Sequence, residues 1–515
     1  MSPHVKVNRP SDAEETQLNR AGEVEDLIDA VKSLIVPFIR DADNAAPSRA
    51  SGFIAADSQG APGRNVLVDY HKPEDLVKKL DVSMPEDGAG REGLLDMVQT
   101  ILRYSVNTWD QGFLDKLYSS INPVGVASEL VLATLNTNVH IYNTSPALTI
   151  IEKTVARRLA GLFGFKGPRA GGVTCQGGSA SNLTSLVIAR NTLYPETKTT
   201  GNGAHRFAIF TSEHGHYSVE KAAIICGMGS DSVVAVAVDS AGQMIPSSLR
   251  DAIQHAKSEG KTPLYVNATA GTTVWGSYDS FTEIASICKE FGIWLHIDGS
   301  WGGPAIFSAA QRHKLAGSEY ADSLTCNPHK MLNVPLTCSF LLTNDVSVFQ
   351  RANTLRAGYL FHNPGDDDDE VWDLADLTLQ CGRRGDALNF ALAWIYYGEK
   401  GIASQVDGAF ATAAYLATLI QESEDFFLLS SNPPPCLQVC FYYTPGGVLP
   451  SEAAENTRRT REMVEKLVPR GFMIDYAPGE KGSLFRVVVN CQTLKGTVEG
   501  LVKALREVGR EVVSS

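Results

Sequence analysis

The chain has 515 residues, of which 43% are hydrophobic and 20% are charged, and its formal net charge is −13. This length allows two or three domains with at least one large hydrophobic core. The negative charge disfavours nucleic acid and anionic membranes as the main partners, because both would repel the protein. No apolar run reaches the ~18 residues of a membrane span, and none follows a basic start as in a signal peptide. We therefore expect a cytoplasmic protein with no membrane or nucleic-acid partner.

The nine cysteines are scattered, and none forms a CxxC pair. This usage is typical of reduced thiols inside a cytosolic protein. His214 and His216 have no matching carboxylate or third histidine at the spacing of a zincin motif, so we expect no metal site.

Residues 1–120 form the first region, a polar arm that contains one amphipathic segment. Its apolar residues follow helical spacing: Leu27, Ile28, Val31, Leu34 and Ile35. The spacing predicts a helix that docks on another surface, and a partner subunit is one candidate.

Residues 121–398 alternate helical and strand-like segments. The runs "FAIFTS", "LYVNATA" and "IWLHIDGS" are short, apolar and rich in β-formers, whereas "TIIEKTVARRLAGLFGF", "FTEIASICKEFG" and "GDALNFALAWIYYGEKG" have helical spacing. Alternation of this kind predicts an α/β domain with a doubly wound parallel sheet. Residues 399–515 carry "LQVCFYYTP" and "SLFRVVVN" between helical segments, which predicts a smaller α+β domain.

Lys330 stands in "SLTCNPHKMLNVPLTCSF", between apolar or small residues. Such a lysine can simply extend its stem to the surface. It can also be a Schiff-base residue, because burial lowers the pKa of the ammonium and frees the amine. Both interpretations stay open for this residue alone.

Two further segments offer what a Schiff-base cofactor needs. Asp298 ends the apolar run "IWLHIDGS", and the carboxyl end of a parallel strand is where ligands bind in this architecture. The segment "TCQGGSASN" leads through Gly178 and Ser179 into a helix, whose N-terminus favours a phosphate; Ser181 or Asn182 could add hydrogen bonds. A turn aspartate and an ordinary helix cap are the alternatives.

The ends of two other predicted strands carry polar residues. "TSEHGHYSVEKAA" follows "FAIF" and offers His214 and His216, which could stack on an aromatic ring or move a proton. Thr269, in "NATAGTTVWGSYD", could bond a cofactor substituent. Ordinary loop polarity explains each of them equally well when it is considered alone.

The ordered series "CQGGSASN", "SEHGHYSVEKA", "NATAGTTVWGSYD", "WLHIDGSWGG", "NPHKMLNVPLTCS", "AGYLF" and "LQCGRRGD" resembles the group II pyridoxal-phosphate (PLP) amino-acid decarboxylases. Within that family it looks closest to the branch that acts on glutamate and cysteine sulfinate. The resemblance covers roughly residues 90–510. It implies the PLP-dependent transferase-like fold type I, in which a large domain with a parallel or mixed sheet is flanked by helices and joined to a smaller α+β domain and an N-terminal helical arm. It also implies decarboxylation of a small acidic L-amino acid to an amine and CO2, and a homodimer with the active site at its interface.

The resemblance also implies roles for individual residues. Lys330 would hold PLP as a covalent aldimine, Asp298 would pair with the pyridine nitrogen, and His216 would stack on the ring. The remaining cofactor contacts would come from Gly178, Ser179, Thr269, Ser300 and His329. Arg486, in "SLFRVVVN", would hold a substrate carboxylate with its planar guanidinium.

This sequence departs from the family pattern in the substrate region. Lys116, in "FLDKL", stands where a glutamine is usual, and "LNTNVHIY" keeps Asn138 but puts His140 at the place of an aromatic residue. These changes could add positive charge near the distal group of an acidic substrate. The alternative is that Lys116 forms a structural ion pair with the strand partner of Asp115.

A second departure concerns the fate of the substrate carbanion. Family decarboxylases carry a tyrosine on a mobile loop after "AGYLF", but residues 362–373 here read "HNPGDDDDEVWD". The proton could then come from His216 or water, which would leave amine release intact. The alternatives are diverted chemistry, with an aldehyde or a new carbon–carbon bond as the outcome, and a PLP enzyme that does not decarboxylate.

Overall fold

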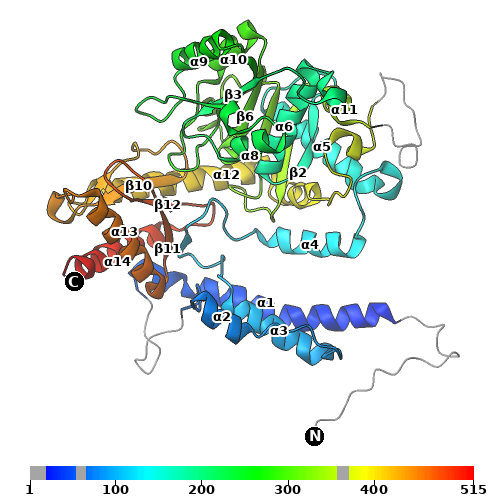
Figure 1. The fold of residues 1–515 in the computed structure, drawn as a ribbon. Coiled ribbons are helices and arrows are strands. Elements are labelled where there is room, and N and C mark those ends of the chain that lie inside the picture. Colours follow the sequence, from blue (N-terminus) through cyan, green and yellow to red (C-terminus); the bar gives the residue numbers. More distant parts are fainter. Residues whose placement is uncertain (1–18, 54–64, 356–369, 515) are drawn as a thin grey trace, which may run out of the picture.

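Seven strands form the larger sheet of the computed structural model, which describes residues 19–53, 65–355 and 370–514. Their order is β2–β8–β7–β6–β5–β3–β4, and Figure 1 shows this sheet within the upper part of the molecule. The strands are β2 (Gly171–Gln176), β3 (Phe207–Ser212), β4 (Val233–Val236), β5 (Thr262–Thr269), β6 (Trp294–Gly299), β7 (Ser323–Cys326) and β8 (Cys338–Thr343).

The predicted strands β3, β5 and β6 are confirmed, and they pair in parallel. The sheet as a whole is mixed, because β8 runs antiparallel to both β2 and β7. Only residues 327–337 connect β7 to β8. A parallel crossover needs about a dozen residues or more, so this short connection, which carries Lys330, returns the chain antiparallel.

Helices cover both faces of this sheet, as expected for an α/β domain. Phe210 points into a core shared with one set of helices, and its neighbour Ile209 points into a core shared with the other set. The first set comprises α5 (Pro146–Leu162), α9 (Pro246–Ser258), α10 (Phe281–Phe291) and α12 (Ala387–Gln421); the second comprises α6 (Gly178–Leu193), α8 (Ser218–Ile225) and α11 (Ser347–Asn353).

A second sheet of five strands lies in the C-terminal part, in the order β1–β11–β12–β10–β9. Its elements are β1 (Phe113–Leu114), β9 (Phe426–Leu428), β10 (Gln438–Tyr443), β11 (Met473–Ala477) and β12 (Leu484–Val488), with α13 (Ala453–Leu467) and α14 (Lys495–Ser514) packed beside them. The predicted segments at β10 and β12 are confirmed. The exact domain limits 120/121 and 398/399 stay a prediction; α12 runs across the second one, with a non-helical residue at Gly398.

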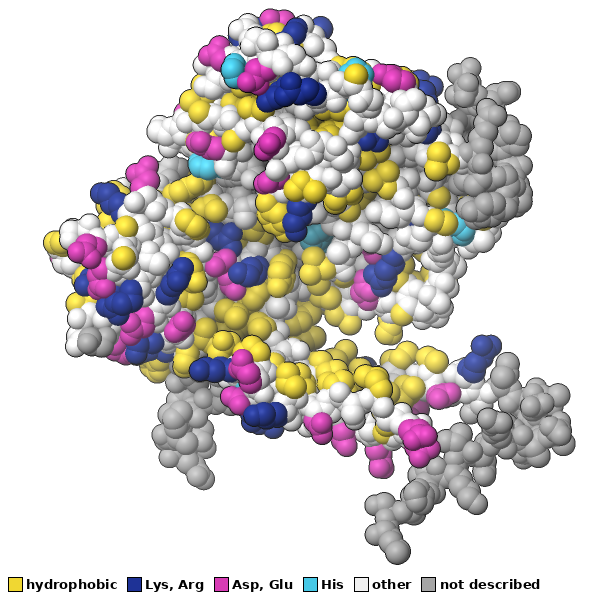
Figure 2. Space-filling model, in the orientation of Figure 1, with side chains coloured by type: hydrophobic (Ala, Val, Ile, Leu, Met, Phe, Trp, Pro, Cys, Tyr) yellow, Lys and Arg dark blue, Asp and Glu magenta, His cyan; other side chains and the backbone are white. Residues whose placement is uncertain are grey.

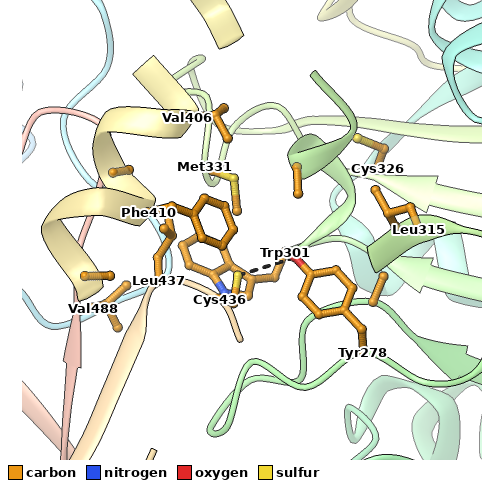
Figure 3. Packing of buried hydrophobic residues seen from close by; sticks show 14 of the residues in the cluster. Tyr278, Trp301, Leu315, Cys326, Met331, Val406, Phe410, Cys436, Leu437 and Val488 are labelled. Atoms are coloured by element: carbon orange, nitrogen blue, oxygen red, sulfur yellow. Dashed lines mark hydrogen bonds between the residues drawn. The ribbon is translucent and has the colours of Figure 1, made fainter. Parts of the chain in front are cut away.

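One continuous core joins the two sheets. Trp301, just beyond β6, packs with Phe410 of α12, with Leu437 directly before β10 and with Val488 of β12 (Figure 3). The indole Nε1–H of Trp301 also donates to Gln438 Oε1 at 2.9 Å. This packing fixes the smaller sheet against the edge of the larger one where β6 ends.

The N-terminal arm contains α1 (Arg20–Ser51), which confirms the predicted amphipathic helix, with α2 (Pro73–Leu80) and α3 (Gly90–Tyr104) beside it. α1 packs against α3 and α14 of the same chain. Its end is fastened by Arg49, which donates to both carboxylate oxygens of Asp110 at 2.7 and 2.6 Å in a buried pair. Within the described ranges, no helix is both long enough and apolar enough to span a bilayer.

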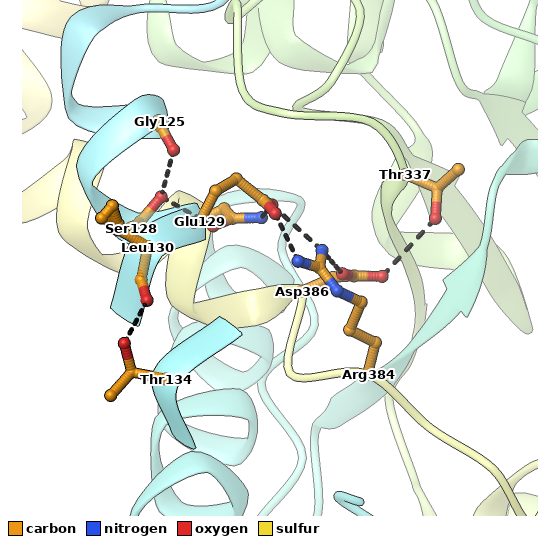
Figure 4. Close-up of polar contacts among 9 residues, drawn as sticks. Gly125, Ser128, Glu129, Leu130, Thr134, Thr337, Arg384 and Asp386 are labelled. Atoms are coloured by element: carbon orange, nitrogen blue, oxygen red, sulfur yellow. Dashed lines mark hydrogen bonds and ion pairs between the residues drawn. The ribbon is translucent and has the colours of Figure 1, made fainter. Parts of the chain in front are cut away.

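Helix α4 (Pro123–Leu135) lies between the arm and the larger sheet (Figure 1). Glu129 of α4 forms an ion pair with Arg384, which also contacts Asp386 at 3.1 Å (Figure 4). Ser128 donates to Asn389 at 2.6 Å. These contacts hold α4 on the first turn of α12.

Candidate active site

Polar residues from several strand ends meet at one edge of the larger sheet. Thr269 and Asp298 are register partners on β5 and β6, and Asp298 is in turn the partner of Thr325 on β7. His216 follows β3, the Lys330 loop follows β7, and α6 begins two residues after β2. The carboxyl ends of parallel strands lie at the same edge, which is the ligand edge of this architecture.

Asp298 is a buried carboxylate that stays ionised. Its Oδ2 accepts from Asn182 Nδ2 at 2.9 Å, and its Oδ1 accepts from the backbone N–H of Ser300 at 3.0 Å. Burial raises the pKa of Asp298, but these two hydrogen bonds and the positive charge of Lys330 outweigh it, so the pKa lies below its usual value. A permanent anion at this position can hold a protonated ring nitrogen.

Lys330 is prepared to react as an amine. Burial lowers the pKa of its ammonium, and the attraction of Asp298 offsets this only in part. The side chain nevertheless keeps some exposure, which leaves it accessible. The loop itself is tied down, because His329 Nδ1 bonds the Cys338 carbonyl at 2.6 Å and Thr337 donates to Asp386 at 3.5 Å (Figure 4).

A cradle for an anion lies at the start of α6. The first backbone N–H groups of a helix have no partner within the helix, and here they belong to Gly178, Ser179 and Ala180. A Cβ on Gly178 would lie 2.5 Å from Ser300 Oγ and 2.9 Å from Asn327 Nδ2, so only glycine leaves this space open. Both of those atoms are buried without a partner among the described residues.

Thr269 offers a third unpartnered donor. Its Oγ1 is buried and unbonded within the described part of the chain, while its backbone N–H donates to Asp279 Oδ2 at 2.7 Å. Two orphaned polar atoms at the opening beside Gly178, and a third on Thr269, the register partner of Asp298, fit a phosphorylated aldehyde cofactor. PLP requires each of these features: an anion cradle, an acid for its ring nitrogen and a lysine amine.

His216 lies beside these groups, and the charges of Asp298 and Lys330 act on it. Burial is the largest effect and lowers the pKa of its imidazole, so the ring is neutral near pH 7. His216 Nδ1 contacts Ser218 Oγ at 2.8 Å. The structure thus brings His216 near Asp298 and Lys330, and its stacking on a cofactor ring stays a prediction.

Arg486 of β12 lies in a charged cluster on the smaller sheet. It donates to the Thr273 carbonyl at 3.0 Å and to Asp475, its register partner on β11. Lys116 Nζ is 3.0 Å from both Asp475 and Asp115. The structure thus contains the ion pair with the strand neighbour of Asp115 that was the alternative for Lys116.

Asn138 and His140 have structural partners. Asn138 Oδ1 accepts from the backbone N–H of Arg383 at 2.8 Å, and His140 Nδ1 contacts the Asn138 carbonyl at 3.1 Å. No described contact joins either of them to Arg486 or Lys330. Their role in substrate binding stays a prediction.

Sequence reasoning missed Asn327, Ser218, His296 and Asp475. Asn327 carried a usable signal, because it opens the "NPHK" turn whose last residue is Lys330. His296 carried another, since it stands two positions before Asp298 on β6 and so shares its face. Asp475 gave none, because its partner Lys116 is 359 positions away, and its pairing with Arg486, 11 positions away, depends on the register of β11 and β12.

The predicted tyrosine-free loop lies mostly outside the described residues, as does the whole "AGYLF" segment. Of residues 362–373, the structure describes Glu370 to Asp373. Within that part, Trp372 lies under the ammonium of Lys153, 4.5 Å from the ring centre.

The fold and the edge just described define a PLP enzyme of fold type I. Residues 73–444 match the pyridoxal-dependent decarboxylase conserved domain, and the chain belongs to that family. It is a PLP-dependent amino-acid decarboxylase, as the sequence motifs predicted.

Relatives and solved structures agree with this assignment. The chain is 60% identical over 497 residues to L-aspartate decarboxylase dtxS4 of Metarhizium robertsii, covering 96% of this chain and 99% of that protein. It is 39% identical to a glutamate decarboxylase-like protein of Gibberella zeae, covering 88% and 94%. The apo crystal structure of mouse CSAD superposes with a TM-score of 0.84 at 32% identity, covering 95% and 99%.

Proposed function

We propose that this enzyme removes the α-carboxyl group of L-aspartate and releases β-alanine and CO2. The observation that carries the proposal is the 60% identity, over nearly the whole length of both chains, to a protein named L-aspartate decarboxylase. Lys116 and Arg486 both pair with Asp475, and Lys116 also pairs with Asp115, so two cations and two carboxylates lie close together where the substrate carboxylate is expected to bind.

We assign the cofactor contacts to the residues at the sheet edge. Gly178 and Ser179 would bind the phosphate with backbone N–H groups, and the orphaned Ser300 and Asn327 side chains would complete its hydrogen bonds. The orphaned Thr269 hydroxyl would bond a substituent of the cofactor ring. His329 packs directly beside Lys330 and would border the cofactor. When bound, PLP supplies the electron sink into which the electrons of the broken C–C bond flow.

The protein's own part in the reaction is to hold charge and orientation. Asp298 would keep the cofactor nitrogen protonated, because its own pKa is held low by Ser300, Asn182 and Lys330. Lys330 would be the residue that binds the cofactor covalently, and it would release the cofactor to the substrate amine and bind it again afterwards. This task suits an amine whose ammonium is destabilised by burial. Arg486 would fix a substrate carboxylate through charge-assisted hydrogen bonds.

We also propose that the enzyme is a homodimer with the site at its interface. Several large apolar side chains of the arm and of α4 are exposed, among them Ile101, Val131 and Leu135. Figure 2 shows hydrophobic side chains along the arm on the edge that faces α4. A monomer rarely leaves such a surface open. Replacing Val131 by glutamate should convert a dimer to monomers in sedimentation, whereas Val77→Glu on α2 should not.

The substrate is tested with a panel of L-aspartate, L-glutamate, L-cysteine sulfinate and L-tryptophan. CO2 release is measured together with the organic product by mass spectrometry. We expect L-aspartate to give the highest kcat/KM and β-alanine to equal CO2 in amount. Preference for another acid would overturn the substrate, while an aldehyde with peroxide would show diverted chemistry. A cytoplasmic location stays a prediction from composition.

A further inference from the structure

A hydrogen-bond chain passes beneath the site from β6 to His216. Trp294, Ser323, His296, Asn182 and Ser218 are its buried members. It ends at the ring of His216, which is partly exposed. The buried members come from β6, β7, α6 and α8, so the chain ties four elements together. None of these residues has a role in the proposed reaction beyond the contact between Asn182 and Asp298.

Asn182 determines which groups donate and which accept along this hydrogen-bond chain. Asp298 Oδ2 is an ionised oxygen that only accepts, so the Asn182 atom 2.9 Å away is the amide nitrogen. The second N–H of this amide donates to Ser218 Oγ at 2.9 Å. The amide oxygen therefore faces His296 Nε2, which lies 3.2 Å away and must carry a proton to donate.

The buried end of the chain agrees with this direction. Trp294 Nε1–H can only donate, and it lies 2.9 Å from Ser323 Oγ. Ser323 then donates to His296 Nδ1 at 2.8 Å, which leaves the single proton of a neutral ring on Nε2. Burial lowers the pKa of His296 to about 4, as a neutral ring requires. Each hydroxyl and each ring in the chain thus has one consistent orientation.

At the active-site end of the hydrogen-bond chain, two donors bond to the same acceptor, His216 Nδ1. The Ser218 hydroxyl accepts from Asn182 and gives its own proton to His216 Nδ1 at 2.8 Å. The backbone N–H of Ser218 also points at Nδ1, at 3.2 Å, and a backbone N–H cannot reverse its role. His216 Nδ1 is therefore an acceptor without a proton.

We propose that Asn182 and Ser218 hold His216 as a neutral imidazole with its proton on Nε2, so that it serves the reaction as a fixed hydrogen-bond donor and not as the acid that protonates the substrate carbon. A ring whose Nδ1 accepts two hydrogen bonds resists protonation to imidazolium, and a neutral ring that gave up its Nε2 proton would become an imidazolate anion. Asn182 and Ser218 are positioning residues, because they act through His216. The inference rests on the proposed function only in placing His216 against the cofactor.

The first test reads the proton directly. The holoenzyme is prepared with 15N-labelled histidine, and the His216 signals are assigned by their loss in His216→Gln. We expect Nε2 to carry a proton and Nδ1 to carry none from pH 6 to pH 8. A proton on Nδ1 in this range would overturn the proposal. This spectrum needs no substrate, so a wrong substrate assignment leaves its result untouched.

The second test separates a donor from an acid. Glutamine offers an amide N–H near the place of Nε2–H but cannot supply an acidic proton, whereas leucine offers neither. With full PLP content, we expect His216→Gln to keep kcat within ~10-fold of wild type and His216→Leu to lose clearly more. If His216 were the acid, both variants would lose the ~10²- to 10⁴-fold of general-acid catalysis. Equal loss in both would overturn the proposal.

The third test addresses the positioning residue. Ser218→Ala removes one donor to Nδ1, so the acidic limb of the kcat profile should move to higher pH by about half to one unit, and kcat should fall ~3- to 10-fold. KM and PLP content should stay within twofold. Charges that act on His216 come from Asp298, Lys330 and Lys221, and none is altered. The control is Ser128→Ala. Ser128 also has a buried hydroxyl with two hydrogen bonds, to Gly125 and Asn389, but it is not part of the hydrogen-bond chain that ends at His216 (Figure 4). An unchanged limb in Ser218→Ala, or the same shift in Ser128→Ala, would overturn the role of Ser218.

Discussion

The two ends of the candidate site are built on different sheets and in different ways. At the cofactor end, Asp298 is buried and accepts hydrogen bonds from the Asn182 amide and the backbone N–H of Ser300. Neither donor is bonded to another carboxylate among the described residues. At the substrate end, Arg486 and Lys116 are already paired with Asp475, and Lys116 is nearly half exposed. At the cofactor end the anion is thus held by neutral donors, whereas substrate binding at the other end must compete with an existing ion pair. The first end should tolerate no change of charge, and the second should respond in a graded way.

The largest expected effect follows from Asp298→Asn. The variant removes the permanent anion from the cofactor end while keeping the size of the side chain. We expect kcat to fall ~10²- to 10³-fold, since electrostatic stabilisation of this kind is usually a large part of catalysis. Steady-state CO2 release measures it. The surface variant Asp251→Asn on α9 is the control, and a fall of less than ~10-fold would contradict the assigned role of Asp298.

A smaller effect is expected from Arg486→Lys at the substrate end. Lysine keeps the charge but loses the planar guanidinium that can grip a carboxylate with two N–H groups. We expect KM for L-aspartate to rise ~10- to 100-fold with a smaller change in kcat. Arg470→Lys, at a surface ion pair of the smaller domain, serves as the control. An unchanged KM would mean that Arg486 holds no substrate carboxylate.

The comparison becomes sharper with Lys116→Met. This variant leaves Asp475 paired with Arg486 alone, so more of the arginine charge is cancelled by its own neighbour. An ion pair as exposed as this one contributes at most about 1 kcal/mol, so we expect a ~3- to 5-fold weaker affinity for L-aspartate. Titration of the cofactor absorbance with L-aspartate and with L-alanine measures it. Equal weakening for both amino acids would show that Lys116 does not recognise charge.

The smallest effect on activity is expected from Asp279→Asn, which probes stability. Asp279 accepts from the backbone N–H groups of Met244 and Thr269, and burial raises its pKa from 3.8 to about 6. The folded protein therefore binds this proton more tightly than the unfolded chain. The resulting stabilisation is complete below pH 3.8 and is lost as the pH rises through 6.

Urea unfolding of wild type and Asp279→Asn between pH 4.5 and 7 checks this expectation. Lowering the pH should favour the wild type over the variant by about 1 to 3 kcal/mol. Parallel curves for the two proteins would show that Asp279 does not titrate in this window.

The sequence predicted the parts of the fold and the site that depend on local pattern. Short apolar runs revealed β3, β5 and β6, and strand ends with polar residues revealed Thr269, Asp298 and His216. The sequence analysis missed the antiparallel strand β8, because an apolar run does not indicate the direction of a strand. The direction follows from the short connection between β7 and β8. The cluster of Lys116, Asp475 and Arg486 depends on β1 pairing with β11, a contact that joins residues more than 350 positions apart. No local pattern carries such information.

The core shared by the two sheets also decides how the protein comes apart on heating. Trp301, Phe410 and Val488 lie in one continuous apolar cluster, and α12 contributes to the packing of both sheets. Unfolding of one sheet would expose this cluster to water, and the other sheet would lose its packing as well. The enzyme should therefore show a single calorimetric transition in which both sheets melt together.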